Sequence, residues 1–340
     1  MSTAAEKTDR VGGSIVMDPR QTFRRIPLAP HQLLERITPQ DDLFVLGHVG
    51  IAHVDVKSWS LSIDGLIGRG ATFSFDQLRQ LPKKEIEAFH QCAGYPNNPR
   101  IATRRVGNVV WGGADLKALL GDLGLSPDAR FLWSYGCDGG EYDGIKSDLY
   151  LKDCPLDRIM AGDALLAYEI NGEPLNAEHG FPARLVVPGF YGTNSVKWLS
   201  RLHIADRRAD GPFTTRLYND PAENGATRPV WQIAPESLIV SPAPDAEVRA
   251  GPIEIWGWTW ADGGVAAVEI STDSGQTWRA AELEKQRSRS WQKFQASWHP
   301  EGTGSVVLVS RATDSHGEAQ PPAAWRNSIY AVQVVKTGIR

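Results

Sequence analysis

Cys92 is the residue of this sequence whose surroundings best suit metal chemistry. It ends the apolar run EIEAFHQC and opens the glycine- and proline-containing loop AGYPNNPR. A thiol at the end of a strand is held firmly, and the nearby glycine allows another group to approach the backbone. Thiolate is a soft ligand that suits a soft metal. Because a lone cysteine is also a common small buried residue, this position alone leaves both interpretations open.

Cationic and hydrogen-bonding side chains gather in a second segment, HGFPARLVVPGFYGTNSVKW. Arg184 offers a planar fork for phosphate, and Lys197 offers a mobile point charge. Ser195 adds a hydroxyl on a glycine-rich loop, and His179 precedes Gly180, where backbone amides could reach a ligand. This set suits a cofactor that carries a phosphate or nucleotide. The alternative is ordinary surface charge, with Arg184 exposed on a strand and the Lys197 ammonium extended into water.

Composition and missing motifs exclude several other classes of protein. The chain has only three cysteines, Cys92, Cys137 and Cys154, which is too few for a disulfide framework. No C-x-x-C or C-x-x-C-H pattern occurs, which excludes a paired-cysteine metal or redox site and covalent haem. The P-loop, the dinucleotide fingerprint and the serine-hydrolase elbow are absent. The net charge of −4 gives no indication of nucleic acid, and no apolar run of about 18 residues could span a membrane. No apolar segment follows Arg24-Arg25, so we expect a cytoplasmic protein.

The patterning of the chain predicts the elements that position these residues. Residues 1–40 are polar and irregular and are expected to form an arm. Residues 41–210 combine strand-like runs with two short helices, FSFDQLRQLP and ADLKALLGDLGL, which predicts an α+β or mixed α/β catalytic domain. Residues 211–235, rich in proline, asparagine and glycine, predict a linker or a long crossing loop. Residues 236–340 contain only short strands and turns, which indicates an immunoglobulin-like β-sandwich.

Together these segments make the chain resemble the sulfite oxidase family of molybdopterin enzymes, over about residues 41–335. HQCAG is similar to the family's cysteine motif. LLAYEINGEPL and HGFPARLVVPGFYGTNSVKWL match the next two blocks in order and spacing, and EISTDSGQTW matches a hairpin of the C-terminal sandwich. The resemblance implies a molybdenum–molybdopterin cofactor and two-electron oxygen-atom transfer on a small molecule. The direction and the electron acceptor stay open, so reduction of a sulfoxide or another X=O compound is an alternative.

The resemblance also assigns roles to individual residues. Cys92 would supply a thiolate to molybdenum. The residues that would hold the pterin and its phosphate are His179, Arg184, Ser195 and Lys197, with His48 and Asp138 as weaker contacts. Tyr168 would place its hydroxyl in the substrate pocket, where Arg104 and Arg105 could add positive charge. The chain carries all of these residues together. This argues against a third interpretation, in which the protein keeps the fold but is a cofactor-free binding or assembly protein.

The family also implies a homodimer formed mainly through the C-terminal sandwich. The chain has 12 tryptophans, and five lie between Trp256 and Trp291. Packing in the core and at interfaces is the ordinary explanation of such indoles. The segment WGWTW nevertheless carries more indole than we expect a sandwich of about 100 residues to bury, which favours an exposed dimer interface.

The sequence departs from the family where positive charge is expected. Leu46, Val110 and Val265 stand where the family usually carries arginine. Each charge-assisted hydrogen bond to an anion contributes about 1.5–3 kcal/mol, so a compact dianion would bind less tightly. We therefore expect sulfite oxidation to be weak or absent, and a bulkier or less charged compound to compete better. The loop arginines that could supply the missing charge instead are Arg100, Arg104 and Arg105.

Overall fold

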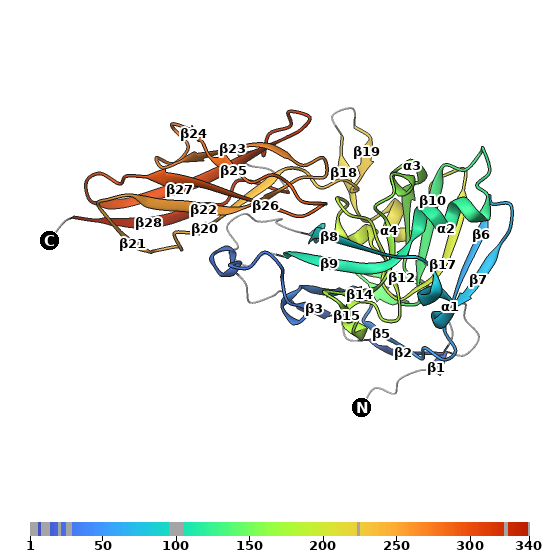
Figure 1. Cartoon of the computed structure of the whole chain (residues 1–340). Coiled ribbons are helices and arrows are strands. Elements are labelled where there is room, and N and C mark those ends of the chain that lie inside the picture. The colour runs from blue at the N-terminus through green and yellow to red at the C-terminus, as the bar shows by residue number, and fades with distance from the viewer. Residues whose placement is uncertain are drawn as a thin grey trace. The chain divides into compact units, whose positions relative to one another are not determined.

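The computed structural model consists mostly of β-strands with few helices (Figure 1). The residues that the structure describes are 6–7, 14–19, 22–24, 29–94, 105–222, 225–322 and 326–338. Within them the α-helices are short: α1 (Phe75–Gln80), α2 (Leu116–Leu123), α3 (Leu156–Met160) and α4 (Pro212–Thr215). No helix in this described part is long and apolar enough to cross a membrane.

The chain forms two compact units, which are described separately. The first unit combines residues 1–24, 44–86 and 110–231, and the second combines residues 25–43, 87–109 and 232–340. Each unit is therefore assembled from segments that are far apart in the sequence. The expected mixture of strands and short helices over residues 41–210 is present, with strands predominating.

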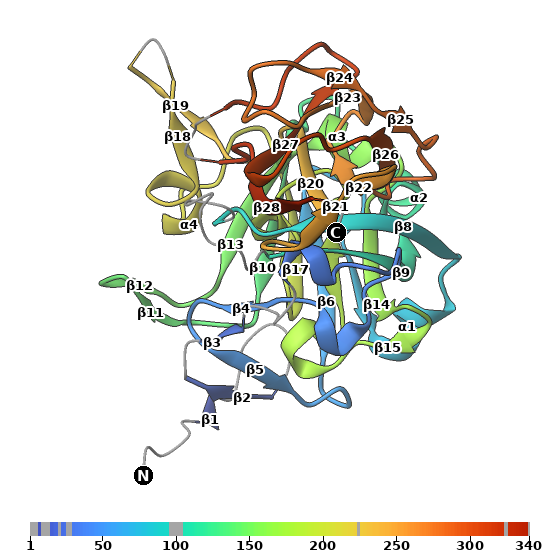
Figure 2. The same ribbon diagram turned by 90° about the vertical axis from the view of Figure 1, so that its left-hand side faces the viewer.

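A five-stranded sheet forms the main layer of the first unit. Its order is β13-β10-β17-β6-β7; β10, β17, β6 and β7 are labelled in Figure 1, and β13 is labelled beside β10 in Figure 2. Only the β17–β6 pairing is parallel. The bounds are β6 (Ser60–Gly65), β7 (Ala71–Ser74), β10 (Phe131–Gly136), β13 (Leu151–Pro155) and β17 (Leu199–Ala205). Its inward residues, such as Leu61, Leu132 and Leu202, are completely buried.

A second sheet carries the segments around the candidate site residues. Its order is β15-β14-β9-β8, and β16 pairs with β14. The bounds are β8 (Lys83–Gln91), β9 (Val106–Asp115), β14 (Leu165–Ile170), β15 (Glu173–Pro174) and β16 (Arg184–Val186). The predicted strand–turn–strand around Asn171-Gly172 is confirmed, with φ of 53° and 83° at these two residues. Positive φ at both positions is what a tight hairpin turn of this kind requires.

The local signals of the two predicted helices are confirmed. The Ser74 hydroxyl oxygen accepts a hydrogen bond from the Gln77 amide, and the Ser74 amide donates to the Gln77 side-chain oxygen, which forms a capping box. Asp115 caps α2 through the amides of Lys117 and Ala118. Gly124 ends α2 in the left-handed region, with φ of 74°.

Smaller elements complete the first unit. They are β1 (Glu6–Lys7), β2 (Ile15–Asp18), β3 (Thr22–Arg24), β4 (Val45–Gly47), β5 (Ile51–Val54), β11 (Gly140–Tyr142), β12 (Ile145–Ser147), β18 (Asn219–Pro221) and β19 (Thr227–Pro229), with 3-10 turns η3 (Ala177–His179) and η4 (Gly192–Asn194). The region expected to be a linker, residues 211–235, contains α4 and the β18–β19 hairpin. Phe213 and Val230 from this region are buried.

The second unit has two sheets in its C-terminal part. The first has the order β20-β22-β26-β25, and the second β21-β28-β27-β23-β24. The bounds are β20 (Glu236–Ser241), β21 (Glu247–Arg249), β22 (Ile253–Trp260), β23 (Val265–Ser271), β24 (Arg279–Ala280), β25 (Glu282–Leu283), β26 (Gln292–Trp298), β27 (Gly304–Asp314) and β28 (Ala331–Thr337). The 3-10 turns η1 (Pro30–Gln32) and η2 (Gln40–Asp42) belong to the same unit.

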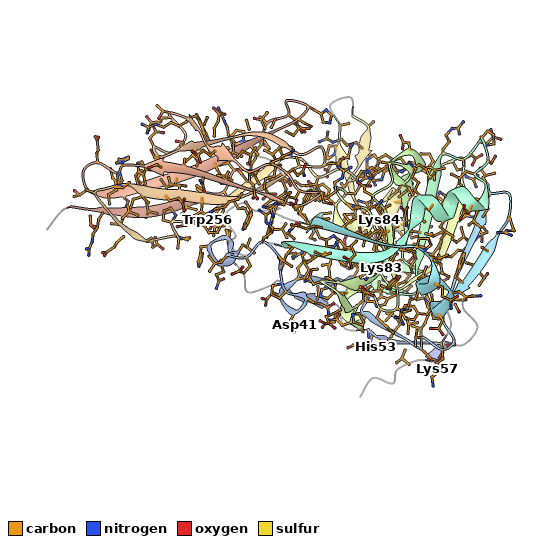
Figure 3. The ribbon with its side chains drawn as sticks, viewed as in Figure 1. Asp41, His53, Lys57, Lys83, Lys84 and Trp256 are labelled. Atoms are coloured by element: carbon orange, nitrogen blue, oxygen red, sulfur yellow. The ribbon has the colours of Figure 1, made fainter. Side chains whose placement is uncertain are left out.

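The expectation that WGWTW exposes its indoles is wrong. Trp258 and Trp260 are 4% and 0% exposed, and only Trp256 of this segment is partly exposed (Figure 3). Trp258 stacks on Trp291 with ring centres 4.8 Å apart. The indole N–H of Trp260 donates to the Gln91 side-chain oxygen at 2.8 Å, and that of Trp258 donates to the Leu33 carbonyl oxygen. Residues from outside residues 236–340 therefore supply the hydrogen-bond partners of these indoles.

We predict that Trp260→Ala lowers the free energy of unfolding of the second unit by about 3–5 kcal/mol, because it leaves a cavity and removes the indole N–H that donates to the Gln91 side-chain oxygen. Trp256→Ala is the matched control in the same strand and should cost less than about 1 kcal/mol. Urea unfolding followed by circular dichroism measures both. Equal losses would contradict the assignment of Trp260 to the core.

Candidate cofactor-binding and active site

Cys92 lies directly after β8 and is 3% exposed. Its amide donates to the Arg105 carbonyl oxygen at 3.0 Å, which ties the start of the loop to the residue before β9. Its Sγ accepts a hydrogen bond from the Gly94 amide at 3.3 Å and lies 3.7 Å from the Arg105 guanidinium. The Gly94 amide and the Arg105 guanidinium are therefore both directed at the Cys92 sulfur. Arg104 and Arg100 lie outside the described residues.

Gly94 allows this arrangement around the sulfur. A Cβ at this position would lie 3.3 Å from the Arg105 guanidinium and 3.7 Å from the Cys92 Sγ. A side chain there would crowd the guanidinium against the thiol. The buried Cys154 provides a contrast, because burial raises the pKa of its thiol to about 12. Of these two cysteines, Cys92 has the surroundings of a metal ligand.

Arg184 is the centre of the second group of candidate residues, in the first unit. It is 3% exposed, and its guanidinium donates to the carbonyl oxygens of His179 at 3.1 Å and Ser195 at 2.9 Å. The guanidinium also lies over the Trp111 ring, 4.8 Å from its centre. The Ser195 hydroxyl accepts from the Val187 amide at 3.1 Å. The structure therefore brings His179, Arg184 and Ser195 together, as the sequence predicts.

Lys197 and Asp138 belong to the same buried group. The Lys197 ammonium donates to the Glu178 carbonyl oxygen at 2.8 Å and lies 4.1 Å from the centre of the Trp198 ring. Burial lowers the pKa of Lys197, and the nearby positive charge of Arg184 lowers it further. Burial raises the pKa of Asp138, although the charge of Lys197 opposes this effect. Gly136 has no room for a side chain, because a Cβ there would lie 2.4 Å from the Asp138 carboxylate.

His48 follows β4 and lies among aromatic rings in the first unit. Its ring stacks near Tyr150 at 5.8 Å, and its Nε2 is in hydrogen-bond contact with the Tyr218 hydroxyl. The sequence analysis did not single out Tyr218. In the structure its backbone lies in the left-handed region, with φ of 58°. A positive φ at a bulky residue is strained, and such strain is concentrated at functional sites. Only the fold shows that residues 48 and 218 meet.

Tyr168 has a different setting within the first unit. It is 4% exposed and occupies a β-bulge, because the register between β14 and β9 shifts between Ala167 and Glu169. A bulge redirects a side chain relative to a regular strand. Its ring contacts that of Phe75 at 6.3 Å, and burial raises the pKa of its hydroxyl. The adjacent Glu169 pairs with Lys83 at 2.6 Å, on β8 (Figure 3).

Known proteins match nearly all of this chain. A model described as oxidoreductase molybdopterin binding domain matches residues 48–213, and one described as Mo-co oxidoreductase dimerisation domain matches residues 227–335. Sulfite oxidase from Gallus gallus is 30% identical over 86% of this chain and 70% of its own length. The chain belongs to the sulfite oxidase family. Among the animal members that it matches first, it spans between 55% and 70% of their length.

Two further similar proteins agree with this assignment. Sulfite oxidase from Arabidopsis thaliana is 29% identical, over 91% of this chain and 88% of its own. The crystal structure of the sulfane dehydrogenase SoxCD from Paracoccus pantotrophus aligns with a TM-score of 0.78 and 28% identity, over 95% of this chain and 85% of that one. The protein is thus a molybdopterin oxidoreductase, and its cofactor is molybdenum–molybdopterin.

The residues of the first unit suit the phosphate of such a cofactor. Arg184 and Lys197 are both buried, and the charge of Arg184 lowers the pKa of Lys197. In the hydrogen bonds described above, the charged groups of both residues donate to backbone carbonyl oxygens. Carbonyl oxygens offset only part of the cost of burying a cation. A bound phosphate would add negative charge beside these two cations and favour the ammonium form of Lys197. Gly180, with φ of 105°, leaves the space beside Lys197 open, since a Cβ there would lie 3.0 Å from the lysine side chain.

We predict that Arg184→Ala and Lys197→Ala each weaken cofactor retention about ten- to hundredfold, because each removes a charge-assisted contact. Molybdenum and pterin per chain, measured after gel filtration, give the readout. Arg311→Ala is the control, since that guanidinium already pairs with Glu269 in the second unit. Full cofactor content in both first-unit variants would remove these residues from the site.

Proposed function

We propose that this protein catalyses the two-electron oxidation of a sulfur oxyanion of the sulfite class and passes the electrons to a separate acceptor. The observation that carries the proposal is the Cys92 sulfur, which the Gly94 amide and the Arg105 guanidinium both approach. The named activities of the matched relatives, sulfite oxidase and sulfane dehydrogenase, point to the same class of substrate. Arg105 also favours an anionic substrate. Its guanidinium supplies positive charge, whereas Leu46, Val110 and Val265 supply none.

The proposed roles of the residues follow from their chemistry. Cys92 serves as the thiolate ligand of molybdenum, and the cofactor supplies the two-electron redox chemistry when bound. The residues proposed to hold the pterin and its phosphate are His48, Asp138, His179, Arg184, Ser195 and Lys197. The Arg105 guanidinium lies 3.7 Å from the Cys92 sulfur and attracts anions. The roles of Tyr168 and Arg104 in the substrate pocket stay predictions.

The proposed domain organisation is an arm (1–40), a catalytic domain (41–210), a connecting segment (211–235) and a C-terminal domain (236–340). We propose that the C-terminal domain is an immunoglobulin-like sandwich, which its two antiparallel-rich sheets and the match to a dimerisation domain support. The cytoplasmic location expected from the sequence stays a prediction.

The test of this function is sulfite oxidation by the purified holoenzyme with ferricyanide as acceptor. We expect turnover that Cys92→Ser abolishes without unfolding the protein, because the substitution changes one atom at the start of a loop. Cys154→Ser is the matched control and should keep turnover within about twofold, since its thiol is buried and protonated. Full activity of Cys92→Ser, or no molybdenum in the wild type, would reject the proposal. The KM for sulfite also shows how far other charges replace the three arginines.

We further propose that the protein is a homodimer formed through the C-terminal domain. The support is the match of residues 227–335 to a dimerisation domain, and no longer the indoles of WGWTW. Light scattering at micromolar concentration should give twice the chain mass of 37.3 kDa. The test uses the full chain. A monomeric mass would contradict the proposal.

A further inference from the structure

Gln91, the residue directly before Cys92, has both ends of its side-chain amide hydrogen-bonded within the second unit. It is the last residue of β8 and is completely buried. Its side-chain oxygen accepts from the Trp260 indole N–H at 2.8 Å, and its side-chain nitrogen donates to the Glu236 carboxylate, also at 2.8 Å. The same nitrogen lies 3.4 Å from the Asn327 side-chain oxygen. None of the roles described above uses this buried amide.

The chemistry of its two main partners fixes the orientation of the Gln91 amide. An indole N–H can only donate a hydrogen bond, and a carboxylate oxygen accepts one. The amide therefore satisfies both partners in one orientation and not in the flipped one. Trp260 and Glu236 are themselves completely buried. A buried polar network whose members are paired in this way holds its residues in one arrangement, which an apolar side chain of similar size would not do.

Backbone hydrogen bonds join the same end of β8 to the C-terminal sequence. The Phe89 amide donates to the Arg289 carbonyl oxygen at 3.1 Å, and the Arg289 amide donates to the Glu87 carbonyl oxygen at 3.0 Å. The Phe89 ring lies near the Trp260 ring, with ring centres 6.3 Å apart. Of these contacts, those of Gln91 are the nearest to Cys92 in the sequence.

The partners of Gln91 come from a segment with a different family match. Residues 48–213 match a molybdopterin binding domain, whereas residues 227–335, which include Trp260 and Glu236, match a dimerisation domain. In the structure, residues 87–109 nevertheless form one compact unit with residues 25–43 and 232–340. The strand end that leads to Cys92 is therefore part of the unit that contains most of the dimerisation match.

Contacts on two adjacent residues fix the chain where the candidate metal ligand begins. The Cys92 amide donates to the Arg105 carbonyl oxygen at 3.0 Å, and Gln91 is fixed through its side chain. Adjacent residues of an extended chain point to opposite sides. With the Gln91 side chain fixed on one side, the Cys92 sulfur is directed to the other, where the Gly94 amide donates to it. Rotation of the chain at this point would break buried hydrogen bonds of Gln91.

We propose that Gln91 is a positioning residue for the metal ligand, because its hydrogen bonds to Trp260 and Glu236 fix the direction of the Cys92 sulfur. This inference rests on the proposed function, in which Cys92 is the thiolate ligand of molybdenum. It gives the segment matched to a dimerisation domain a second task, which is to orient that thiolate. Removing the partners that orient a metal ligand typically lowers metal affinity or activity about ten- to hundredfold.

The test uses the purified holoenzyme and the variant Gln91→Met, which removes both hydrogen bonds at similar side-chain volume. We expect the rate of molybdenum loss, measured by metal analysis after timed gel filtration, to rise about ten- to hundredfold. The absorption band in which the thiolate transfers charge to molybdenum should shift or weaken. The kcat for sulfite should fall about tenfold or more, with KM within about threefold, because Gln91 does not touch the substrate.

A double variant, Gln91→Glu with Glu236→Gln, tests whether the two hydrogen bonds are responsible. It exchanges the amide and the carboxylate, so that the carboxylate at position 91 can accept from the Trp260 indole and from the amide at position 236. The number of buried carboxylates stays the same. We expect molybdenum retention, the absorption band and kcat to return to within about fivefold of the wild type. The longer contact to Asn327 is not restored, so the recovery is incomplete.

The matched control is Gln320→Met in the same unit. Gln320 is 2% exposed, and its side-chain oxygen accepts from the amides of Ser237 and Ala312 at 3.1 and 3.2 Å and from the Ser237 hydroxyl at 2.7 Å. This substitution should lower the Tm at least as much as Gln91→Met does, because it also removes a buried hydrogen-bonding group. The absorption band, molybdenum retention and kcat should stay within about twofold of the wild type.

An active wild type together with unchanged retention, absorption and kcat in Gln91→Met would reject this inference alone. Equal changes in Gln320→Met would also overturn it, because the stability of the unit would then explain them. A double variant no better than Gln91→Met would overturn it too. A wild type that holds molybdenum and shows the thiolate band, but does not oxidise sulfite, would reject only the proposed substrate, since retention and absorption need no substrate.

Discussion

The first unit depends on the burial of positive charge against backbone carbonyl oxygens. Arg184 holds the carbonyls of His179 and Ser195, and Lys197 holds that of Glu178, so two cations fix the loops on either side of β16. Water would solvate these groups better than carbonyl dipoles do. The pKa of Lys197 is lowered because burial disfavours its charged form. The arrangement suits a protein that binds an anionic cofactor, whose phosphate would add negative charge beside these cations.

The aromatic side chains near these cations follow from the same constraint. The Trp111 ring faces the Arg184 guanidinium, the Trp198 ring faces the Lys197 ammonium, and the Tyr218 ring faces Lys152. A ring face attracts a cation but provides no formal negative charge. Such pairs exclude water and still leave the cation able to act on an anion. A carboxylate in place of any of these rings would neutralise the charge.

Local sequence signals predicted the elements, and tertiary contacts decided most of what they missed. Capping residues such as Ser74 and Asp115 determine where a helix starts, so α1 and α2 were predictable. Arg184, Ser195 and Lys197 are close in sequence and were predictable as one group. Tyr218 and Lys152 acquire their setting only where distant segments meet at His48. The error over WGWTW has the same origin, because Leu33 and Gln91, which lie outside residues 236–340, supply partners for its indoles.

The way charge reaches the substrate also bears on which anions the protein can accept. An arginine in the wall of a pocket binds an oxyanion through a fork of fixed geometry, which selects shape as well as charge. A pocket with fewer arginines depends more on the field of distant charges, which selects charge with little demand on shape. With apolar Leu46 and Val110 at positions that carry arginine in the family, a pocket built this way gives up part of its affinity for the smallest dianion. In return it gains tolerance for larger sulfur oxyanions that a ring of arginines would exclude.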